Sequence, residues 1–405
     1  MFRMIRRVRV DRLLAVSLCL LGFWIPSYVV RAQERVWVEL RAPVEEVAIQ
    51  VPIPLVEVRG VAGAGRSLYY DVALILDLST STRLPSGVDV DGDGHIGVSD
   101  PEISGQYWGS AAPEKLCDDL GDTIAAAEIQ AARRLIKVLD PEHTRVALIA
   151  FGDRGQLEAP LGTTPEGLGK ALDVLDGKHG WYGGTNYSSA LRTALDALMD
   201  PAVARPDALR TILFLSDGFP TMPIPPKTRP EAEARAAATA AARVDARIFA
   251  FALGPEAIKG KAVLTALAER TNGGLELLER PGDVLFHLPL VELSQIAEIR
   301  MENAKGGRPG RAIRLFPDGG FDGFVPLDPG ANTLRITAVS VSGATGVAER
   351  TVVYEPTHGE GRRLELEVER LRTLLRDRTV EIELNAEIKR ERAERRKRLK
   401  IEVER

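Results

Sequence analysis

Apolar residues follow two different spacings in the middle of the chain. Continuous runs such as VALIL at 72–76 alternate with longer stretches whose apolar positions recur every three or four residues. The runs are typical of parallel strands buried on both faces, and the stretches of amphipathic helices, so a doubly wound α/β domain is predicted over residues 68–284. The predicted strands are Val72–Leu76, Val146–Phe151, Thr211–Leu215, Arg247–Leu253 and Leu275–Leu278. The predicted helices are Thr123–Leu139, Pro165–Leu175, Tyr187–Met199, Pro230–Arg243 and Lys261–Thr271.

On both sides of this region the pattern changes to alternating, β-branched segments with Gly and Asp turns. VAIQVPIPLVEVRG precedes the α/β region, and GFVPLDPGANTLRITA follows it; they resemble the opening and closing strands of bacterial immunoglobulin-like domains. Neither side has enough strands for a sandwich of its own. We therefore expect residues 33–67 and 285–355 to form one Ig-like β-sandwich into which the α/β domain is inserted. The alternative is an N-terminal arm followed by a separate sandwich.

Residues 356–405 are strongly charged and predict one long helix. Five apolar residues fall at coiled-coil-like spacing, but Arg378, Asn385 and Lys389 occupy other positions of the same seam, so the pattern decays. A solvated helix is the simplest interpretation. Self-association through this helix, or contact of its basic end with an anionic surface, are the sharper alternatives. The apolar seam residues are Leu364, Val368, Leu371, Leu375 and Ile382.

The first 32 residues have the pattern of an export signal. Several arginines precede an apolar stretch from Leu13 to Trp24, and small residues at Val30 and Ala32 suit cleavage. An uncleaved anchor over Leu13–Val30 is the alternative. Under either interpretation the remaining chain is exported to the periplasm, the cell surface or the medium, where calcium is available. After cleavage no membrane insertion is expected.

Composition excludes several functional classes. The chain has 405 residues and a formal net charge of −4, so nothing in its overall charge favours nucleic acid. Its two cysteines, Cys19 and Cys117, cannot form a disulfide framework. The five histidines make no zinc pattern, and no nucleophile elbow or phosphate loop occurs. An enzyme is therefore not expected.

Oxygen-bearing side chains stand after two of the predicted strands and in one loop before a predicted helix. Asp77, Ser79 and Ser81 follow the first strand, Thr185 precedes a helix, and Asp217 follows the third strand. In open α/β sheets the carboxyl ends of the strands share one edge, where ligands bind. Two carboxylates and three hydroxyls are therefore expected to converge at that edge.

In these residues the chain resembles the von Willebrand factor A family. The resemblance covers residues 70 to about 284 and includes the D-x-S-x-S of Asp77, the threonine after two glycines and the Asp217 after a strand. It implies a metal-ion-dependent adhesion site holding Mg²⁺ (or Mn²⁺ or Ca²⁺). Hydroxyls of Ser79, Ser81 and Thr185 would contact the metal, and Asp77 and Asp217 would act directly or through water.

Hydroxyl ligands leave such a cation electrophilic, so an Asp or Glu of a protein partner is expected to fill its open position. Trp181 and Tyr182, in the loop before Thr185, would contact that partner or pack beneath the loop.

A second candidate metal site lies in an insert at residues 82–121. DVDGDGHIGVSD places Asp89, Asp91, Asp93 and Asp100 at positions 1, 3, 5 and 12 of an EF-hand-type loop, with the His95 carbonyl at position 7. Position 12 is Asp where Glu is usual, and flanking helices are missing. A structural Ca²⁺ clip is predicted, with a metal-free acidic turn as the alternative.

Three functions therefore compete. The first is an exported adhesion module that binds a partner carboxylate through its metal. The second is a structural envelope protein whose metals only stabilise the fold. The third, a metal-dependent hydrolase, is disfavoured because the sequence offers no evident base or nucleophile.

Overall fold

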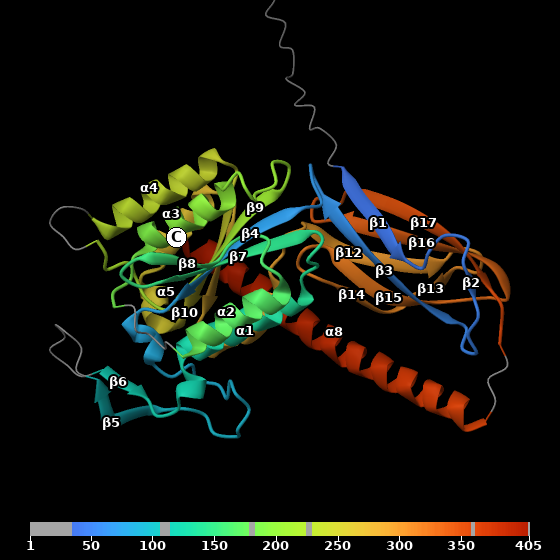
Figure 1. The fold of residues 1–405 in the computed structure, drawn as a ribbon, viewed down its shortest axis with the longest axis horizontal. Helices are drawn as coiled ribbons and strands as arrows, with labels where there is room; N and C mark the ends of the chain where they lie inside the picture. Colours follow the sequence, from blue (N-terminus) through green and yellow to red (C-terminus); the bar gives the residue numbers. More distant parts are fainter. Residues whose placement is uncertain (1–34, 106–113, 178–182, 224–228, 358–360, 404–405) are drawn as a thin grey trace, which may run out of the picture. The chain divides into compact units, whose positions relative to one another are not determined.

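The computed structural model describes residues 35–403 except 106–113, 178–182, 224–228 and 358–360. Its largest sheet has six strands, of which five are parallel and the edge strand β8 is antiparallel to β7 (Figure 1). The strand order is β11 (Gly274–Leu278), β10 (Arg247–Leu253), β9 (Leu209–Ser216), β4 (Tyr70–Asp77), β7 (Thr144–Phe151) and β8 (Gly155–Ala159).

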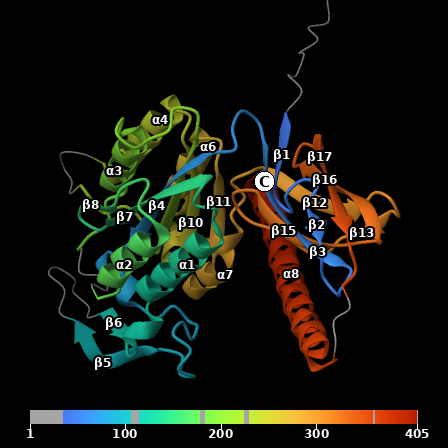
Figure 2. The same ribbon diagram turned by 45° about the vertical axis from the view of Figure 1, so that its right-hand side comes forward.

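Helices cover both faces of this sheet because its strands are apolar on both sides. One face packs against α1, α2 and α7, and the other against α3 to α6; Figures 1 and 2 show the two layers. The mixed α/β fold predicted from the sequence is confirmed, and each strand or helix end predicted within the α/β domain lies within two residues of the observed one. The helices are α1 (Ile124–Val138), α2 (Pro165–Asp176), α3 (Tyr187–Met199), α4 (Pro230–Arg243), α5 (Gly254–Lys259), α6 (Lys261–Arg270) and α7 (Val284–His287).

Strand β4 is central and has β9 on one side and β7 on the other. From β4 the chain crosses first to β7 and later returns to β9 on the opposite side, so the strand order reverses at β4. In open α/β sheets ligands bind where the strand order reverses, at the carboxyl ends of the strands, which here is the edge where β4 and β9 end.

Strands from before and after the α/β region share two further sheets. β3 (Leu55–Ala64) pairs antiparallel with β15 (Gly320–Pro326), and β2 (Ala48–Ile49) pairs with β17 (Thr345–Tyr354). Apolar residues of both sheets form a single buried cluster between them. The remaining strands are β1 (Val36–Ala42) and β14 (Arg311–Leu315) in the first sheet, and β12 (Ile296–Asn303), β13 (Arg308–Pro309) and β16 (Gly330–Ser340) in the second.

A long C-terminal helix, α8 (Gly361–Val403), packs one stripe against its own chain (Figure 2). Arg378 donates to Glu57 of β3 at 3.0 Å and lies over the Phe324 ring. Arg392 donates to Glu276 of β11 at 2.8 Å. Arginines of this helix thus contact acidic residues of β3 and β11; self-association and the Ig-like sandwich stay predictions.

The export signal predicted for residues 1–32 lies outside the described residues. Within the described part of the chain, no helix combines the length and apolar content needed to cross a membrane.

Candidate functional site

The carboxyl end of β4 places a carboxylate in the protein interior. Asp77 is fully buried, and its Oδ1 accepts a hydrogen bond from the Ser79 amide at 2.8 Å. Its Oδ2 accepts from the Ser216 hydroxyl of β9 at 2.6 Å. Among the described residues, no Lys, Arg or His lies within ion-pair distance of Asp77.

The neighbouring serines extend this arrangement to the next loop. Ser81 Oγ donates to Asp217 Oδ1 at 2.9 Å, and the Ser79 and Ser81 hydroxyls are 3.2 Å apart. Asp77 and Asp217, from two different strand ends, are thereby joined through the two serines. Ser79 and Asp217 are buried, which leaves these oxygens little access to bulk water.

Thr185 comes from the loop before α3 and is held at the same edge by backbone contacts. Its amide donates to Thr221 Oγ1 at 2.9 Å, and the Thr80 amide donates to the Gly183 carbonyl at 2.9 Å. These bonds join the Thr185 loop to the loops after β4 and β9. The structure thus brings all five predicted residues to one sheet edge.

Asp153 anchors the Thr185 loop and was not predicted from the sequence. Its Oδ1 accepts from the Gly184 amide at 2.7 Å. Gly183 has φ +77°, and a Cβ there would lie 2.5 Å from Asp153 Oδ2. The two glycines before Thr185 therefore permit a backbone path that a side chain would obstruct.

A third buried carboxylate, Glu128 of α1, also escaped prediction. Its Oε2 accepts from the Asp77 amide at 2.8 Å, and its Oε1 is buried with no hydrogen-bond partner among the described residues. The available signal was a single acidic residue inside the apolar stretch IAAAEIQAA. Such a residue usually marks a solvated helix face, which explains why it was overlooked.

Burial shifts the pKa values of these groups. Burial raises the pKa of Asp77 to about 6, although hydrogen bonds from Ser216 and Ser79 lower it. Burial and then the charges of Asp77 and Asp217 raise the pKa of Glu128 well above its usual range. Each cause disfavours accumulated negative charge at this edge, so a cation bound there would be strongly favoured.

Tyr187, the first residue of α3, completes the buried hydrogen-bond network. Its hydroxyl contacts Ser216 Oγ at 3.0 Å and donates to the Gly218 carbonyl at 2.7 Å. Burial raises its pKa well above the usual range, so it stays neutral. Because Ser216 in turn donates to Asp77, Tyr187 fixes the hydroxyl that orients this carboxylate.

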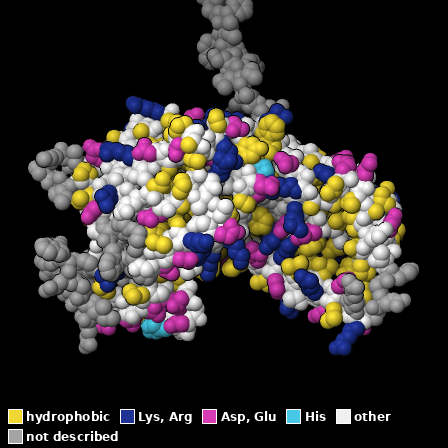
Figure 3. All heavy atoms as spheres, in the orientation of Figure 1, with side chains coloured by type: hydrophobic (Ala, Val, Ile, Leu, Met, Phe, Trp, Pro, Cys, Tyr) yellow, Lys and Arg dark blue, Asp and Glu magenta, His cyan; other side chains and the backbone are white. Residues whose placement is uncertain are grey.

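In the insert, three of the predicted calcium ligands converge. Asp89, Asp91 and Asp93 have carboxylate oxygens within 4.8 Å of one another, and Figure 3 shows acidic side chains gathered over this part of the surface. Asp100 is the second residue of β5 (Ser99–Gly105), which pairs antiparallel with β6 (Glu114–Cys117), and it is not a member of that group. The His95 side chain lies 3.4 Å from Asp118.

Both arms of this loop are tied to one buried carboxylate. Asp122 accepts from the Val90 amide at 2.6 Å and from the Gly97 amide at 2.7 Å. A Cβ on Gly121 would lie 2.2 Å from Asp91 Oδ2, so the chain passes close to the acidic loop at this glycine. Trp181 and Tyr182, predicted as partner contacts, fall outside the described residues.

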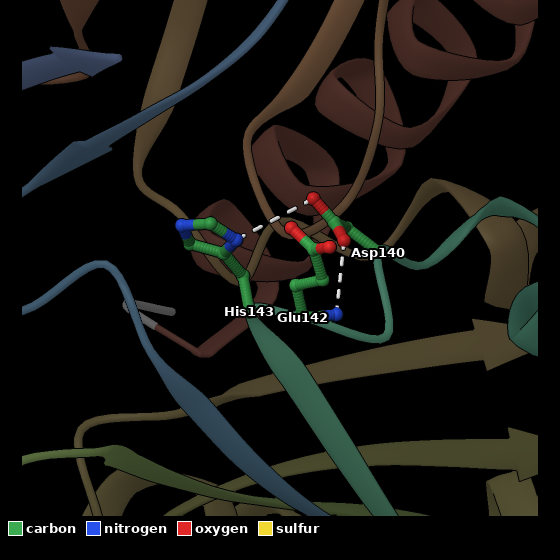
Figure 4. A group of neighbouring side chains, drawn as sticks. All are labelled: Asp140, Glu142 and His143. Atoms are coloured by element: carbon green, nitrogen blue, oxygen red, sulfur yellow. Dashed lines mark hydrogen bonds and ion pairs between the residues drawn. The ribbon is translucent and has the colours of Figure 1, made fainter. Parts of the chain in front are cut away.

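A third acidic group lies where the loop before β7 meets β1. Asp140, Glu142 and His143 turn toward one another (Figure 4). Arg41 of β1 pairs with Asp140 and lies 3.0 Å from Glu142. Because a guanidinium already neutralises these carboxylates, the cluster is an ionic joint between β1 and the α/β domain and not a candidate metal centre.

A family model, the von Willebrand factor type A domain, matches residues 116–219. The chain therefore contains a von Willebrand factor type A domain, a type of module that generally mediates protein–protein interaction. The comparison with curated proteins finds no match.

Several solved structures are similar to parts of the chain. A von Willebrand factor type A protein from Catenulispora acidiphila is 13% identical with a TM-score of 0.37, over 80% of this chain and 74% of that one. The conserved hypothetical protein BatB from Bacteroides thetaiotaomicron is 16% identical with a TM-score of 0.36, over 54% of this chain and 95% of that one. The pilus adhesin SpaC from Lactobacillus rhamnosus GG is 10% identical with a TM-score of 0.36, over 79% of this chain and 47% of that one. At these TM-scores the assignment of the domain depends on the family model alone.

Proposed function

We propose that this chain is an exported binding module that attaches to a protein partner through a divalent cation. Asp77, Ser79, Ser81, Thr185 and Asp217 would hold the cation, with Mg²⁺ as the first choice and Mn²⁺ or Ca²⁺ as alternatives. The observation that supports this most is the edge of the sheet itself: buried carboxylates without a cationic side chain beside Asp77, next to three hydroxyls.

The donor set fits a hard cation. Carboxylate and hydroxyl oxygens are the ligands that Mg²⁺ prefers. Among the described residues, Glu128 Oε1 is buried without a partner, and burial raises the pKa values of Asp77 and Glu128, which a bound cation would offset. When bound, the cation would supply Lewis acidity toward an incoming carboxylate. Ser79 and Ser81 would orient toward it, and Tyr187 and Ser216 would hold Asp77 in place.

Neutral hydroxyls are the reason to expect an acidic partner. They complete coordination without cancelling the charge of the cation, which keeps its affinity for an outside Asp or Glu high. A site meant only to stabilise the fold would gain more from direct carboxylates. Trp181 and Tyr182 would lie beside such a partner.

The acidic insert supports a second, structural cation. We propose that Asp89, Asp91, Asp93 and the His95 carbonyl bind Ca²⁺, with Asp100 completing the set after a local movement. Asp122 already holds both arms of the loop, so the clip would shape the rim beside the first site.

The test of the main proposal is a pull-down from envelope extract of the source organism. The bait is residues 33–405, in Mg²⁺/Ca²⁺ and in EDTA, with Thr185→Ala as the site variant. We expect a partner that is captured only with metal and is lost in Thr185→Ala. A partner indifferent to both would make the site structural and favour the envelope-protein alternative.

Thr80→Ala is the matched control for Thr185→Ala. Thr80 lies between the two serines, but its hydroxyl donates to the Gly183 carbonyl and is not among the proposed ligands. It should capture the partner as the wild type does.

The calcium clip is tested separately by calorimetric titration with Ca²⁺ in excess Mg²⁺. The double variant Asp89→Asn/Asp93→Asn should lose one Ca²⁺ equivalent and retain the Mg²⁺-dependent capture. Unchanged Ca²⁺ stoichiometry would contradict the clip.

The self-association prediction is tested by truncation at Glu355. Sedimentation should show whether the oligomeric state changes; if it does not, the helix serves only its own chain.

A further inference from the structure

The opposite edge of the central sheet contains a pocket lined by four arginines. Arg210 is the second residue of β9, Arg247 begins β10, Arg270 ends α6, and Arg66 lies in the link between β3 and β4. The cavity measures about 350 Å³. It lies at the amino ends of the strands, far from the proposed cation site in the fold, and is separate from it.

The pocket has an excess of positive charge. Asp245 is its one acidic lining residue, and its carboxylate is 3.5 Å from Arg66 with both side chains exposed. In the described part of the chain, Arg210, Arg247 and Arg270 form no ion pair. Three like charges around one cavity repel one another, and an anion bound between them would remove that cost.

Most of the donors of these arginines are unused. Among the described residues each guanidinium of the pocket donates one hydrogen bond to protein: Arg210 to Val244 O, Arg247 to Leu293 O and Arg270 to Thr239 Oγ1. Each guanidinium has five N–H groups. The Arg210 Nε is buried and has no partner. The single bonds to protein hold Arg210 and Arg247 in place, and the remaining donors suit an oxyanion.

Two further observations indicate that this pocket is a preformed binding site. Burial lowers the pKa of Arg247, which shows that this charge is held where water cannot fully solvate it. Three lining residues other than glycine, Asp245, Asn272 and Gln295, have φ between +52° and +57°. Such conformations are costly and concentrate at ligand sites; Asp and Asn tolerate them, but Gln295 does so rarely.

We propose that this pocket binds a phosphate dianion, either free or as the monoester of a small hydroxyl-rich molecule. A phosphate monoester carries roughly two negative charges at pH 7 and three acceptor oxygens, which match three arginines without ion pairs. The exposed amides of Asn272 and Gln295 line the remaining wall and suit hydroxyl groups. The cavity is at the small end of the usual range for ligand sites, about 300–1,000 Å³, so the ligand is small.

Calorimetric titration of the full chain in phosphate-free, low-salt buffer tests this inference. The probes are glucose 6-phosphate, inorganic phosphate, glucose and vesicles containing phosphatidic acid. We expect glucose 6-phosphate to bind and glucose not to bind. Binding of inorganic phosphate alone would identify the free ion as the ligand, and binding of the vesicles alone would identify a lipid headgroup. Both results support the phosphate pocket if Arg270→Gln weakens the binding as stated below.

Arg270→Gln removes one exposed charge of the pocket and should weaken phosphate binding at least about tenfold, since a charge-assisted hydrogen bond is lost. Arg66→Gln should have a smaller effect in the same direction because Asp245 already offsets Arg66. Arg243→Gln is the matched control, an exposed arginine at the end of α4 that does not line the pocket.

No binding of any phosphate probe to the wild type would overturn the proposal. Equal affinity in wild type and Arg270→Gln, with unchanged thermal unfolding, would overturn it as well. Equal weakening in Arg243→Gln and Arg270→Gln would show only general attraction to a basic surface and would also contradict the pocket.

Discussion

Two aspartates at the two ends of β4 differ in the charge that each one faces. Asp71 and Asp77 are both fully buried. Asp71 accepts two hydrogen bonds from the Arg205 guanidinium, at 2.7 and 3.0 Å, and one from the Arg205 amide. Asp77 receives its hydrogen bonds from neutral groups, the Ser79 amide and the Ser216 hydroxyl.

This difference distinguishes Asp71, a structural carboxylate, from Asp77, a candidate cation ligand. A buried charge is stable when its partner is built into the fold, and Arg205 supplies that partner to Asp71. At the other end the charges of Asp77 and Asp217, after burial, raise the pKa of Glu128, and no cationic side chain among the described residues pairs with Asp77. The same strand therefore begins with a carboxylate that an ion pair neutralises and ends with one that has no cationic side chain beside it in the described part of the chain.

The largest expected effect comes from exchanging each aspartate for asparagine in EDTA. Asp71→Asn should lower the free energy of unfolding by about 3 kcal/mol, because it leaves the Arg205 guanidinium without its charge partner. Asp77→Asn should change it by less than about 1 kcal/mol, because it removes a desolvated charge while keeping one acceptor. Urea unfolding measures both. An equal loss of unfolding free energy in the two variants would contradict the proposed difference between Asp71 and Asp77.

Addition of Mg²⁺ should stabilise the wild type next most strongly. At a hundredfold excess over the dissociation constant, binding to the folded state alone adds about 2.7 kcal/mol. Thermal unfolding with and without Mg²⁺ should show this gain in the wild type and in Thr80→Ala. In Thr185→Ala most of the gain should vanish; if it persists, Thr185 is not a ligand.

The affinity for Mg²⁺ should depend on pH through Asp77. A cation must displace the proton of this carboxyl, whose pKa is about 6. Below pH 6 the apparent affinity should therefore fall about tenfold per pH unit and above it level off. Calorimetry at pH 5, 6 and 7 checks the slope; an affinity independent of pH would remove Asp77 from the ligand set.

In EDTA the free energy of unfolding should depend on pH in the opposite direction to the Mg²⁺ affinity: it should fall as the pH rises. The folded protein holds the Asp77 proton more tightly than the unfolded chain, where the pKa is near 3.8. The stabilisation from this proton is complete below that pKa and is lost as the pH rises to about 6. The slope should flatten in Asp77→Asn.

The smallest effect should come from an exposed ion pair. Arg192 of α3 lies 2.6 Å from Glu233 of α4, and the Arg192 side chain is 57% exposed. Arg192→Gln should change the free energy of unfolding by less than about 1 kcal/mol, since solvent screens the pair. A loss as large as that of Asp71→Asn would mean that burial is not what distinguishes these charges.

Much of the α/β domain could be predicted because its signals are local. A strand buried on both faces must be apolar throughout, and a helix on such a sheet must be apolar on one stripe. The edge strand β8 was missed, since a half-exposed strand such as GQLEA lacks a continuous apolar run. Asp77, Ser79, Ser81, Thr185 and Asp217 could be grouped because strand order alone assigns them to one edge.

Glu128 and Asp153 could not be found in the same way. Glu128 lies in α1 and Asp153 in the turn between β7 and β8, and the sequence around each is explained without a functional carboxylate. The hydrogen-bond partner of each comes from a distant part of the chain. Glu128 reaches the Asp77 amide across 51 positions, and Asp153 reaches the Gly184 amide across 31. The phosphate pocket is similar, because its arginines come from four separate segments.

In the C-terminal helix, the sequence determines the local structure, and the tertiary structure determines the contacts. The sequence alone predicted a helical tail within residues 356–405 and a repeating seam along it, because helix propensity and spacing are local properties; the structure has the helix at Gly361–Val403. Only the tertiary structure decided what the seam contacts. Arg378 and Arg392 interrupt the apolar pattern. They are nevertheless buried, because they donate hydrogen bonds to Glu57 of β3 and to Glu276 of β11. An arginine in a seam is unfavourable in isolation and favourable opposite a carboxylate, and for both arginines that carboxylate is more than a hundred residues away in the chain.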